Sequence, residues 1–287
     1  MKTAVIDIGS NSVRLAVISG GKTLYKQKST TRLGEGLSGT GLLSPTAVTR
    51  TAQAVASFKA QAESEGADKV FVFATEAVRS AGNGIELVHS VYDLCGAEVD
   101  VISGEEEAEA GLAGALKGAD GGIIDVGGAS TEVTVRHGGK IVYAKSAGIG
   151  TVRLFDAAGR DRVKLEKAIN AGLEAYGAFD ASAYGMYAIG GTATRLACIK
   201  HGVKDYRPDL TDGTVISVEE MSGYADRLLT MTVEEIRAST VCVASADIVG
   251  GGCLLMYMLM KKFRIKSLTV SEGDNLEGYY MIKAGRQ

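Results

Sequence analysis

An internal repeat limits the folds open to this chain more than any other feature of its sequence. Residues 5–22 align with residues 123–140 at a constant offset of 118, and eight of the 18 aligned positions are identical. Each copy reads as a strand that ends in Asp, a turn of small polar residues, a second strand and a Gly-Gly turn. The repeat therefore predicts two related lobes, 1–119 and 120–287, joined by the glycine-rich stretch at 118–122.

Strands and helices alternate along both copies, which predicts an α/β fold. Short β-branched runs predict strands at 5–8, 13–18, 70–73, 99–102, 123–126, 131–135, 140–145, 186–189 and 267–270. Helical patterns cover 45–65, 85–94, 105–117, 163–178 and 193–200, and the last third of the chain is mostly helical. The first helix has a clear start, because Ser44 can serve as its N-cap with Pro45 in the first position. The final helix could pack back on the first lobe.

The composition excludes several classes of protein. Apolar residues make up 46% of the chain and charged residues 23%, so the chain can bury a core and intrinsic disorder is not expected. The net charge of -3 leaves no basic surface for a DNA or RNA polymer. The four Cys and three His are scattered singly, which argues against a disulfide framework or a structural zinc site.

The longest apolar stretch, 241–260, raises the question of a membrane span. It carries Asp247 and a run of three glycines, and the part after Asp247 is shorter than the roughly 20 residues that a bilayer requires. We therefore expect a buried helix here and no membrane partner. At the N-terminus, Asp7 stands where a signal peptide has its apolar core, so the chain is expected to be cytoplasmic.

The repeated turns predict phosphate-binding loops. Gly, Ser, Asn and Thr between two strands can point several backbone N–H groups and hydroxyls to one side, and phosphate is the usual occupant of such a concavity. The aspartates before the turns, Asp7 and Asp125, would repel phosphate directly but can hold Mg²⁺, which bridges to phosphate oxygens. Two such loops facing each other would hold one phosphoryl group from both sides. The alternative is a pair of ordinary hairpins with permissive turn residues.

A third glycine turn, at 188–195, leads from a strand into a helix. The amides at a helix N-terminus favour an anion, and the candidate contacts here are Gly190, Gly191 and Thr192. A plain strand-to-helix joint is the alternative.

Two other glycine patterns carry less weight. The GxGxxG at 34–39 has no clear strand before it and no helix after it, so it does not read as a dinucleotide fingerprint. The Gly-Lys-Thr at 21–23 lacks the earlier glycine of a Walker A loop, because that position is Ala16.

An acidic cluster at 103–109 offers both a helix start and a catalytic carboxylate. Ser103 and Glu106 form a capping-box pattern, and acidic residues suit a helix N-terminus. Glu107 falls on a different side of the same turn, where it could act as a base toward water. Arg79 follows a strand and is suited to bidentate phosphate contact, although a surface arginine is the plain alternative.

Taken in order, these segments resemble the exopolyphosphatase/guanosine pentaphosphate phosphohydrolase (Ppx-GppA) family. The resemblance covers about three quarters of the chain, from residue 5 to about residue 221. Single motifs recur in sugar kinases, actin and heat-shock ATPases, but the ordered set is more specific, above all the segments around Arg79 and Glu107. The matching stretches are 7–12, 32–37, 74–79, 103–108, 125–132 and 190–195.

The resemblance implies the duplicated ribonuclease-H-like fold of actin-like ATPases, with two lobes around a central cleft. It implies Mg²⁺- or Mn²⁺-dependent hydrolysis of terminal phosphoanhydride bonds in polyphosphate or in guanosine pentaphosphate (pppGpp). Glu107 is then the base that activates water, and Arg79 acts with it on the phosphoryl group. Asp125 and Glu132 match metal-associated positions, with Asp7 opposite them. The matching phosphate contacts are Ser10, Asn11, Ser12, Gly127, Gly128, Ser130 and Thr131.

Four departures from the family pattern bear on this assignment. Ala129 replaces a glycine of the second loop, where its methyl group leaves slightly less room for a phosphate to approach the loop backbone. Ser245 and Leu276 stand where the family commonly has Arg, which bears on C-terminal packing and on the homodimer that the resemblance allows. The chain also stops where longer members continue, which favours short polyphosphates as substrates.

Two other functions use the same kind of loops. An ATP-dependent kinase of small metabolites or carboxylates would need an acceptor site and a nucleotide pocket, which the turn at 190–195 could supply. A nucleotide-binding sensor with weak turnover would bind guanosine pentaphosphate tightly and release little phosphate.

Overall fold

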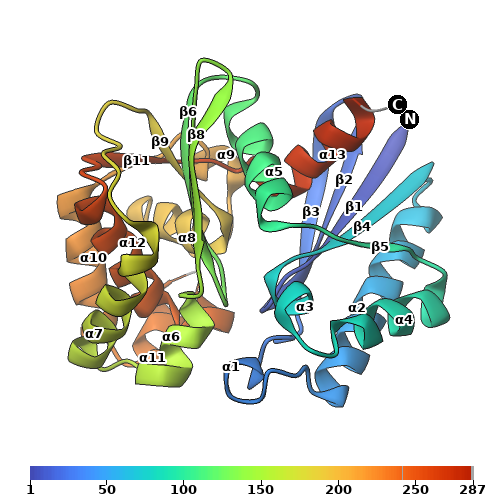
Figure 1. Ribbon diagram of the computed structural model, residues 1–287, viewed down its shortest axis with the longest axis horizontal. Helices are drawn as coiled ribbons and strands as arrows, with labels where there is room; N and C mark the ends of the chain where they lie inside the picture. The colour runs from blue at the N-terminus through green and yellow to red at the C-terminus, as the bar shows by residue number, and fades with distance from the viewer. Residues whose placement is uncertain (241, 286–287) are drawn as a thin grey trace. The chain divides into compact units, whose positions relative to one another are not determined.

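The computed structural model describes residues 1–240 and 242–285, and the chain divides into two compact units. Unit 1 consists of residues 1–114 together with the chain from Asn275 onward, and unit 2 consists of Ala115–Asp274. In chain order, unit 2 is therefore an insertion within unit 1. Each unit has its own mixed sheet with flanking helices (Figure 1).

Unit 1 is built on a five-stranded sheet in the order β3-β2-β1-β4-β5. The strands β1 (Lys2–Ile8), β2 (Ser12–Ser19) and β3 (Lys22–Thr30) form an antiparallel meander. The strands β4 (Lys69–Ala74) and β5 (Val99–Val101) extend the sheet parallel to β1. Its helices are α1 (Leu37–Thr40), α2 (Pro45–Ser64), α3 (Glu76–Ser80), α4 (Gly84–Cys95), α5 (Gly104–Leu116), which crosses into unit 2 at its last turn, and α13 (Asn275–Gly285).

Apolar clusters cover both faces of the unit 1 sheet, because successive side chains of a strand point to opposite faces. On one face, Ile6 and Ile8 of β1 pack in a cluster with the apolar stripe of α2. On the other face, Val5 packs in a cluster with Phe73 of β4 and Tyr279 of α13. The helix α13 thus lies on the unit 1 sheet, against β1 and β2 (Figure 1).

Unit 2 is built on a six-stranded sheet in the order β8-β7-β6-β9-β11-β10. The strands β6 (Gly121–Val126), β7 (Thr131–His137) and β8 (Lys140–Ala147) form an antiparallel meander. β9 (Met186–Ile189) and β11 (Ser267–Val270) continue it in parallel, and β10 (Val215–Ser217) is an antiparallel edge strand. Its helices are α6 (Thr151–Ala158), α7 (Arg162–Leu173), α8 (Gly190–Lys200), α9 (Pro208–Thr211), α10 (Val218–Thr230), α11 (Val233–Ser239) and α12 (Val249–Lys262).

The two sheets carry the internal repeat in their backbones as well as in their sequences. β1, β2 and β3 correspond to β6, β7 and β8, and in both sheets the next two strands run parallel to the first. The pairing of the second and third strands shifts register at Val17/Ile18 and at Val135/Arg136, which are equivalent positions of the repeat. The predicted α/β fold with a duplicated ribonuclease-H-like unit is confirmed.

Most of the predicted elements are present, with boundaries that differ by a few residues. The helix α2 begins as predicted, since the Ser44 side chain accepts a hydrogen bond from the Ala47 amide and Pro45 follows it. The helix predicted at 163–178 ends at Leu173 and continues as a short 3-10 turn. The sequence patterns do not predict β3, β10, α3 and α6.

The glycine pattern at 34–39 requires a correction. The strand β3 ends four residues before Gly34, and α1 forms a single helical turn directly after Gly36, where the sequence analysis expects neither a strand nor a helix. The turn is bounded by two left-handed glycines, Gly36 at φ 74° and Gly41 at φ 70°. Because β3 is an antiparallel edge strand, the segment still lacks the parallel strand–helix–strand unit of a dinucleotide site.

The helix α12 accounts for most of the apolar stretch at 241–260, of which Val241 lies outside the described residues. The helix is buried along most of its length, as predicted. None of the helices in the described part of the chain combines the length and the apolar character needed to cross a bilayer.

We predict that Ser44→Ala lowers the free energy of unfolding by about 1 kcal/mol, because the Ala47 amide loses its capping acceptor. Urea denaturation followed by circular dichroism measures the change. The matched control is Ser64→Ala in the last turn of α2, where the hydroxyl bonds only the nearby carbonyl of Gln61 and the effect should stay within about 0.5 kcal/mol. Equal losses in the two variants would show that the cap contributes nothing of its own.

Candidate active site

The first candidate loop, residues 9–12 between β1 and β2, has its carbonyl groups engaged by a neighbouring segment of unit 1. The Gly9 amide donates to the Ser12 carbonyl at 3.0 Å and closes the turn. The carbonyls of Ser10 and Asn11 accept hydrogen bonds of 2.8 to 3.1 Å from amides in residues 31–34. Within residues 1–240 and 242–285, the amides of Ser10 and Asn11 donate to no protein acceptor. These donors are therefore suited to an anion.

The segment that supports this loop is itself held in a strained conformation. Arg32 has a φ of 47°, in the left-handed region that non-glycine residues rarely adopt. Such a conformation persists only where the surroundings determine it. Part of that determination comes from α2, because Arg50 Nε donates to the Thr31 carbonyl at 2.6 Å.

The second candidate loop, residues 127–130 between β6 and β7, has the same turn and a different support. The Gly127 amide donates to the Ser130 carbonyl at 3.0 Å, as in the first loop. The carbonyls of Gly127 and Gly128 accept hydrogen bonds of 2.9 to 3.2 Å from the first amides of α6. Among the described residues, the amides of Gly128 and Ala129 have no protein acceptor. Ala129 leaves the turn intact, so this departure from the family pattern is tolerated.

Two neighbours fix the position of the second loop. A Cβ atom at Gly150, the residue before α6, would lie 2.5 Å from the Gly128 carbonyl and 2.7 Å from the Ala129 nitrogen, so only glycine allows α6 to come this close. Thr131 is fully buried, and its hydroxyl donates to the Ile149 carbonyl at 2.6 Å. The Thr131 hydroxyl therefore supports the segment before α6 rather than a ligand.

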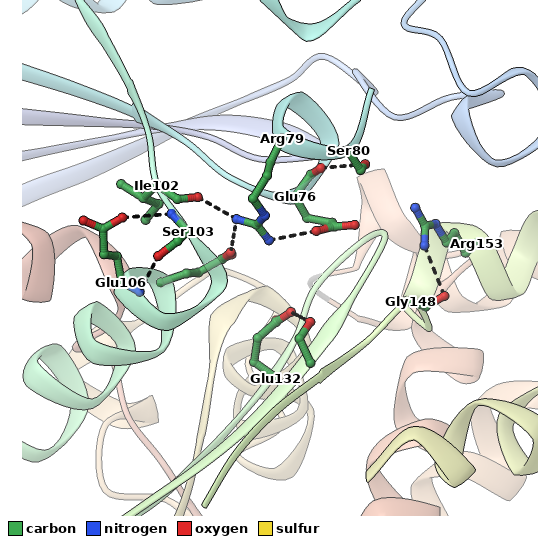
Figure 2. Close-up of polar contacts among 11 residues, drawn as sticks. Glu76, Arg79, Ser80, Ile102, Ser103, Glu106, Glu132, Gly148 and Arg153 are labelled. Atoms are coloured by element: carbon green, nitrogen blue, oxygen red, sulfur yellow. Dashed lines mark hydrogen bonds and ion pairs between the residues drawn. The ribbon is translucent and has the colours of Figure 1, made fainter. Parts of the chain in front are cut away.

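The two copies differ in the residue that faces the loop aspartate. Asp7 is paired in register with Arg14, and the two form an ion pair with an Nε–Oδ2 distance of 2.9 Å. In unit 2 the equivalent pair is Asp125 and Glu132. Glu132 is buried and accepts a hydrogen bond from Ser146 Oγ at 2.6 Å (Figure 2). Unit 1 thus neutralises its aspartate with its own cation, whereas unit 2 places two carboxylates opposite each other.

The Asp125–Glu132 pair fits a divalent cation such as Mg²⁺. Side chains directly opposite each other on antiparallel strands lie about 5 Å apart, and like charges there repel. Mg²⁺ would relieve this repulsion, and it commonly binds through one or two carboxylates with water and substrate phosphate as further ligands. In the part of the chain that the structure describes, no group of three or more His, Cys, Asp or Glu could hold a metal.

The third glycine turn lies beside Asp125. Gly190 has a φ of 81°, and a Cβ atom there would lie 2.7 Å from Asp125 Oδ1. The helix α8 begins at Gly190 without a side-chain cap, so among the described residues its first amides, including those of Gly191 and the buried Thr192, have no capping side chain. Unit 2 therefore brings together the second loop, the acidic pair and this helix start.

In unit 1, Glu107 forms an ion pair with Arg79. Arg79 Nη1 donates to Glu107 Oε2 at 3.2 Å and to the Ile102 carbonyl at 2.7 Å, while Nη2 donates to Glu76 Oε2 at 2.7 Å (Figure 2). Glu107 is only 8% exposed. Burial alone would lower the pKa of Arg79, but the carboxylates of Glu107 and Glu76 raise it, so the guanidinium stays charged. The result is a buried carboxylate held beside a fixed cation.

The capping box at the start of α5 is confirmed. The Ser103 amide donates to Glu106 Oε2 at 2.9 Å, and the Glu106 amide donates to Ser103 Oγ at 3.2 Å (Figure 2). Glu106 is exposed, whereas Glu107 is buried next to Arg79. The cap therefore does not need the Glu107 side chain, which leaves that carboxylate for another role.

Three residues that shape the site are not among those predicted from the sequence. At the offset of the repeat, Arg14 aligns with Glu132, and this contrast in charge could have revealed the different partners of the two aspartates. Glu76 stands three residues before Arg79, which is the helical spacing for an ion pair. No local pattern marks Gly150, because its constraint comes from backbone that is distant in the sequence.

The two remaining side-chain departures lie in the cores. Leu276 is 1% exposed and packs in the same cluster as Phe73 and Tyr279, so an apolar residue suits this position. Ser245 is 2% exposed, and its Oγ has no hydrogen-bond partner among the described residues.

Nearly the whole chain matches a known family, since residues 4–285 fit the model of the Ppx/GppA phosphatase family. Exopolyphosphatase 2 of Mycobacterium tuberculosis is 29% identical over 99% of this chain and 99% of its own. The guanosine-5'-triphosphate,3'-diphosphate pyrophosphatase of Photobacterium profundum is 33% identical over 60% of this chain and 36% of its own. The crystal structure of the Aquifex aeolicus member of the Ppx/GppA family matches with a TM-score of 0.79 and 27% identity, over 100% of this chain and 98% of that one.

We predict that Gly150→Ala raises the KM for a phosphate-releasing substrate about tenfold. The added methyl group would displace the second loop from the α6 amides, and a tenfold change corresponds to about 1.4 kcal/mol, the scale of one hydrogen bond to a charged group. Steady-state kinetics measures it. The control is Gly148→Ala, where a Cβ atom would meet only the flexible guanidinium of Arg153 and KM should stay near the wild-type value. Indistinguishable KM values in the two variants would contradict a role for loop position in binding.

Proposed function

This chain belongs to the Ppx/GppA phosphatase family, and we propose that it hydrolyses the terminal phosphoanhydride bond of inorganic polyphosphate, of guanosine pentaphosphate, or of both. The observation that carries the proposal is the buried Glu107 carboxylate, held by Arg79 in the same unit as the first candidate loop. A positioned carboxylate of this kind is what the activation of water requires. Ser103 and Glu106 form the helix cap without it.

The relatives support both substrates. The relative that matches along its whole length is named as an exopolyphosphatase, and the one that matches 60% of this chain is named for guanosine-5'-triphosphate,3'-diphosphate. Both compounds end in a row of phosphates joined by anhydride bonds. Backbone amides would bind only the terminal phosphoryl oxygens, which the two substrates have in common. The proposal therefore rests on hydrolysis of the terminal phosphoanhydride bond that both substrates contain.

In the proposed reaction, loop amides bind and orient phosphate oxygens of the substrate. The amides of Ser10 and Asn11 are the candidate donors in unit 1, and those of Gly128 and Ala129 are the candidate donors in unit 2, because none of them has a protein acceptor among the described residues. Further donors are available from the hydroxyls of Ser12 and Ser130 and from the α8 start at Gly190, Gly191 and Thr192. Phosphoryl transfer needs positioning and charge neutralisation more than covalent chemistry. Fixed hydrogen-bond donors of this kind supply the positioning.

Glu107 accepts a proton from a water molecule as the water oxygen attacks the terminal phosphorus. The bond from that phosphorus to the bridging oxygen breaks, so the products are orthophosphate and a chain shorter by one phosphate. Arg79, fixed by Glu76 and the Ile102 carbonyl, holds the Glu107 carboxylate in one orientation. Removal of a positioned general base typically costs about 10²–10⁴ in rate.

Asp125 and Glu132 would hold Mg²⁺, which when bound supplies positive charge against the phosphate oxygens. Asp7 is the weaker candidate for a direct ligand, because Arg14 already neutralises it. Its role in the proposal is to anchor the start of the first loop through that ion pair.

We expect the protein to release phosphate with water as the only acceptor. The test is a panel of polyphosphates of several lengths, guanosine pentaphosphate and ATP, assayed for orthophosphate with and without Mg²⁺ or Mn²⁺. Excess chelator should abolish release, because Asp125 and Glu132 would then repel a polyanion. Full activity in chelator would refute the metal assignment.

Other results of the same panel would identify the two alternative functions. ADP formation that depends on an added small-molecule acceptor would indicate a kinase. Tight binding of guanosine pentaphosphate with almost no phosphate release would indicate a sensor. The ratio of kcat/KM values between polyphosphate and guanosine pentaphosphate identifies the preferred substrate.

We predict that Glu107→Gln lowers kcat by about 10²–10⁴ while substrate affinity changes little or improves. The amide keeps the size of the side chain but cannot accept the proton, and one negative charge is lost near a polyanionic substrate. Stability should change little, because the capping pair is intact and Arg79 keeps Glu76 and the Ile102 carbonyl.

The matched control is Glu106→Gln, one residue away in the same helix turn. It weakens the capping box and should lower stability by up to about 1 kcal/mol while kcat stays near the wild-type value. An inactive Glu106→Gln beside an active Glu107→Gln would show that the wrong carboxylate has been assigned. Wild-type kcat in both would mean that the acidic cluster is only a helix start.

A further inference from the structure

The helices α5 and α13 approach each other at a glycine with no room for a side chain. A Cβ atom at Gly278 would overlap the carbonyl oxygen of Ala110 and would lie 2.5 Å from its carbonyl carbon and 2.9 Å from its Cα. These are backbone atoms of a helix, so they cannot swing aside as a flexible side chain would. Gly278 therefore sets how deeply α5 is seated against α13.

The helix α13 is firmly attached and cannot easily give way. The Tyr279 ring stacks on Phe73 of β4 with centroids 4.5 Å apart, and its hydroxyl donates to Asp100 Oδ2 at 2.7 Å. One turn further along, Lys283 Nζ also contacts Asp100 Oδ2 at 2.7 Å. An atom added at Gly278 would therefore push on α5 as well as on α13.

The contact on α5 lies one turn from Glu107. Ala110 is fully buried and follows Glu107 by three residues, so the two stand on the same side of a rigid helix. The partner of Glu107 cannot follow a displaced helix, because the Arg79 guanidinium is also bonded to Glu76 and to the Ile102 carbonyl, each at 2.7 Å. The Arg79–Glu107 contact, at 3.2 Å, is the longest of the three and would be the first to open.

We propose that Gly278 is a positioning residue, which places the Glu107 carboxylate by allowing α13 to pack directly on the backbone of α5. The proposal rests on the proposed function, in which Glu107 activates water. In this proposal α13 affects the chemical step indirectly, because Gly278 has no side chain that could contact a substrate. A misplacement of about 1 Å at a reacting group can cost about 10²-fold in rate.

The test compares Gly278→Ala with two controls by steady-state kinetics and thermal unfolding. Gly278→Ala should lower kcat about 10- to 100-fold with KM within about twofold of wild type. Gly223→Ala in α10 adds the same methyl group where nothing lies within 4 Å and should leave kcat unchanged. Tyr279→Phe removes the bond to Asp100 without adding an atom, so it should lower Tm and leave kcat unchanged. A loss of kcat in Tyr279→Phe equal to that in Gly278→Ala would overturn the role of the close contact.

A double-mutant cycle with Glu107→Gln separates positioning from a general structural defect. If Gly278 acts through Glu107, Gly278→Ala should cost less than about twofold in kcat in the Glu107→Gln background. If Gly278→Ala lowers kcat by the same factor in both backgrounds, or does not lower it at all, the proposal is overturned. In either case an inactive Glu107→Gln variant would still support the proposed function. Wild-type kcat for Glu107→Gln would instead refute the proposed function, and Gly278 would have no base to position.

A second variant covers the case in which Gly278→Ala does not accumulate as folded protein. Ala110→Ser adds a single atom to the buried side chain of the α5 residue whose backbone meets Gly278, in the cluster that also holds Leu276 and Tyr279 of α13. It should reproduce the loss of kcat, again only when Glu107 is present. A folded Ala110→Ser protein with wild-type kcat would overturn the proposal.

Discussion

Both candidate phosphate loops depend on having their carbonyl groups engaged elsewhere. A short turn contains as many carbonyls as amides, and a carbonyl facing a phosphate would repel it. In unit 1 the carbonyls bond to residues 31–34, which includes a left-handed Arg32, and in unit 2 they bond to the start of α6, which a glycine at position 150 makes possible. Two unrelated supports therefore produce one result, a turn whose amides are left for a ligand.

The two copies of the repeat share one backbone arrangement but differ in the charge of the residue opposite the loop aspartate. Turn, register shift and strand order recur at equivalent positions, but the residue across from the aspartate is Arg14 in one copy and Glu132 in the other. In the first copy Arg14 forms an ion pair with the aspartate, whereas in the second copy two acidic residues are paired in register beside the helix start at Gly190. The chain therefore keeps two similar loops with different side chains opposite the loop aspartate.

The features that follow from local sequence could be predicted, and those set by distant contacts could not. The repeat, the Ser44 cap and the separation of Glu106 from Glu107 depend on residues a few positions apart, and the structure bears out the fold, the cap and the capping box. The strand β3 escapes prediction because it is a largely polar edge strand, with a pattern that lacks a buried face. Gly150 and Gly278 carry no local signal at all, because what they exclude is the backbone of a segment far away in the chain.

The place of α13 in the chain also determines when unit 1 can be finished. Phe73 and Tyr279 stack on each other although more than 200 residues separate them, and all of unit 2 lies between α5 and its packing partner. On the ribosome, the helix α5 is made before unit 2, whereas its packing partner α13 is made after unit 2. Long-range contacts of this kind form late, so the sheet of unit 1 can form well before α5 is packed against α13. The synthesis of α13 is therefore the event that allows unit 1 to close the apolar cluster around Phe73 and Tyr279.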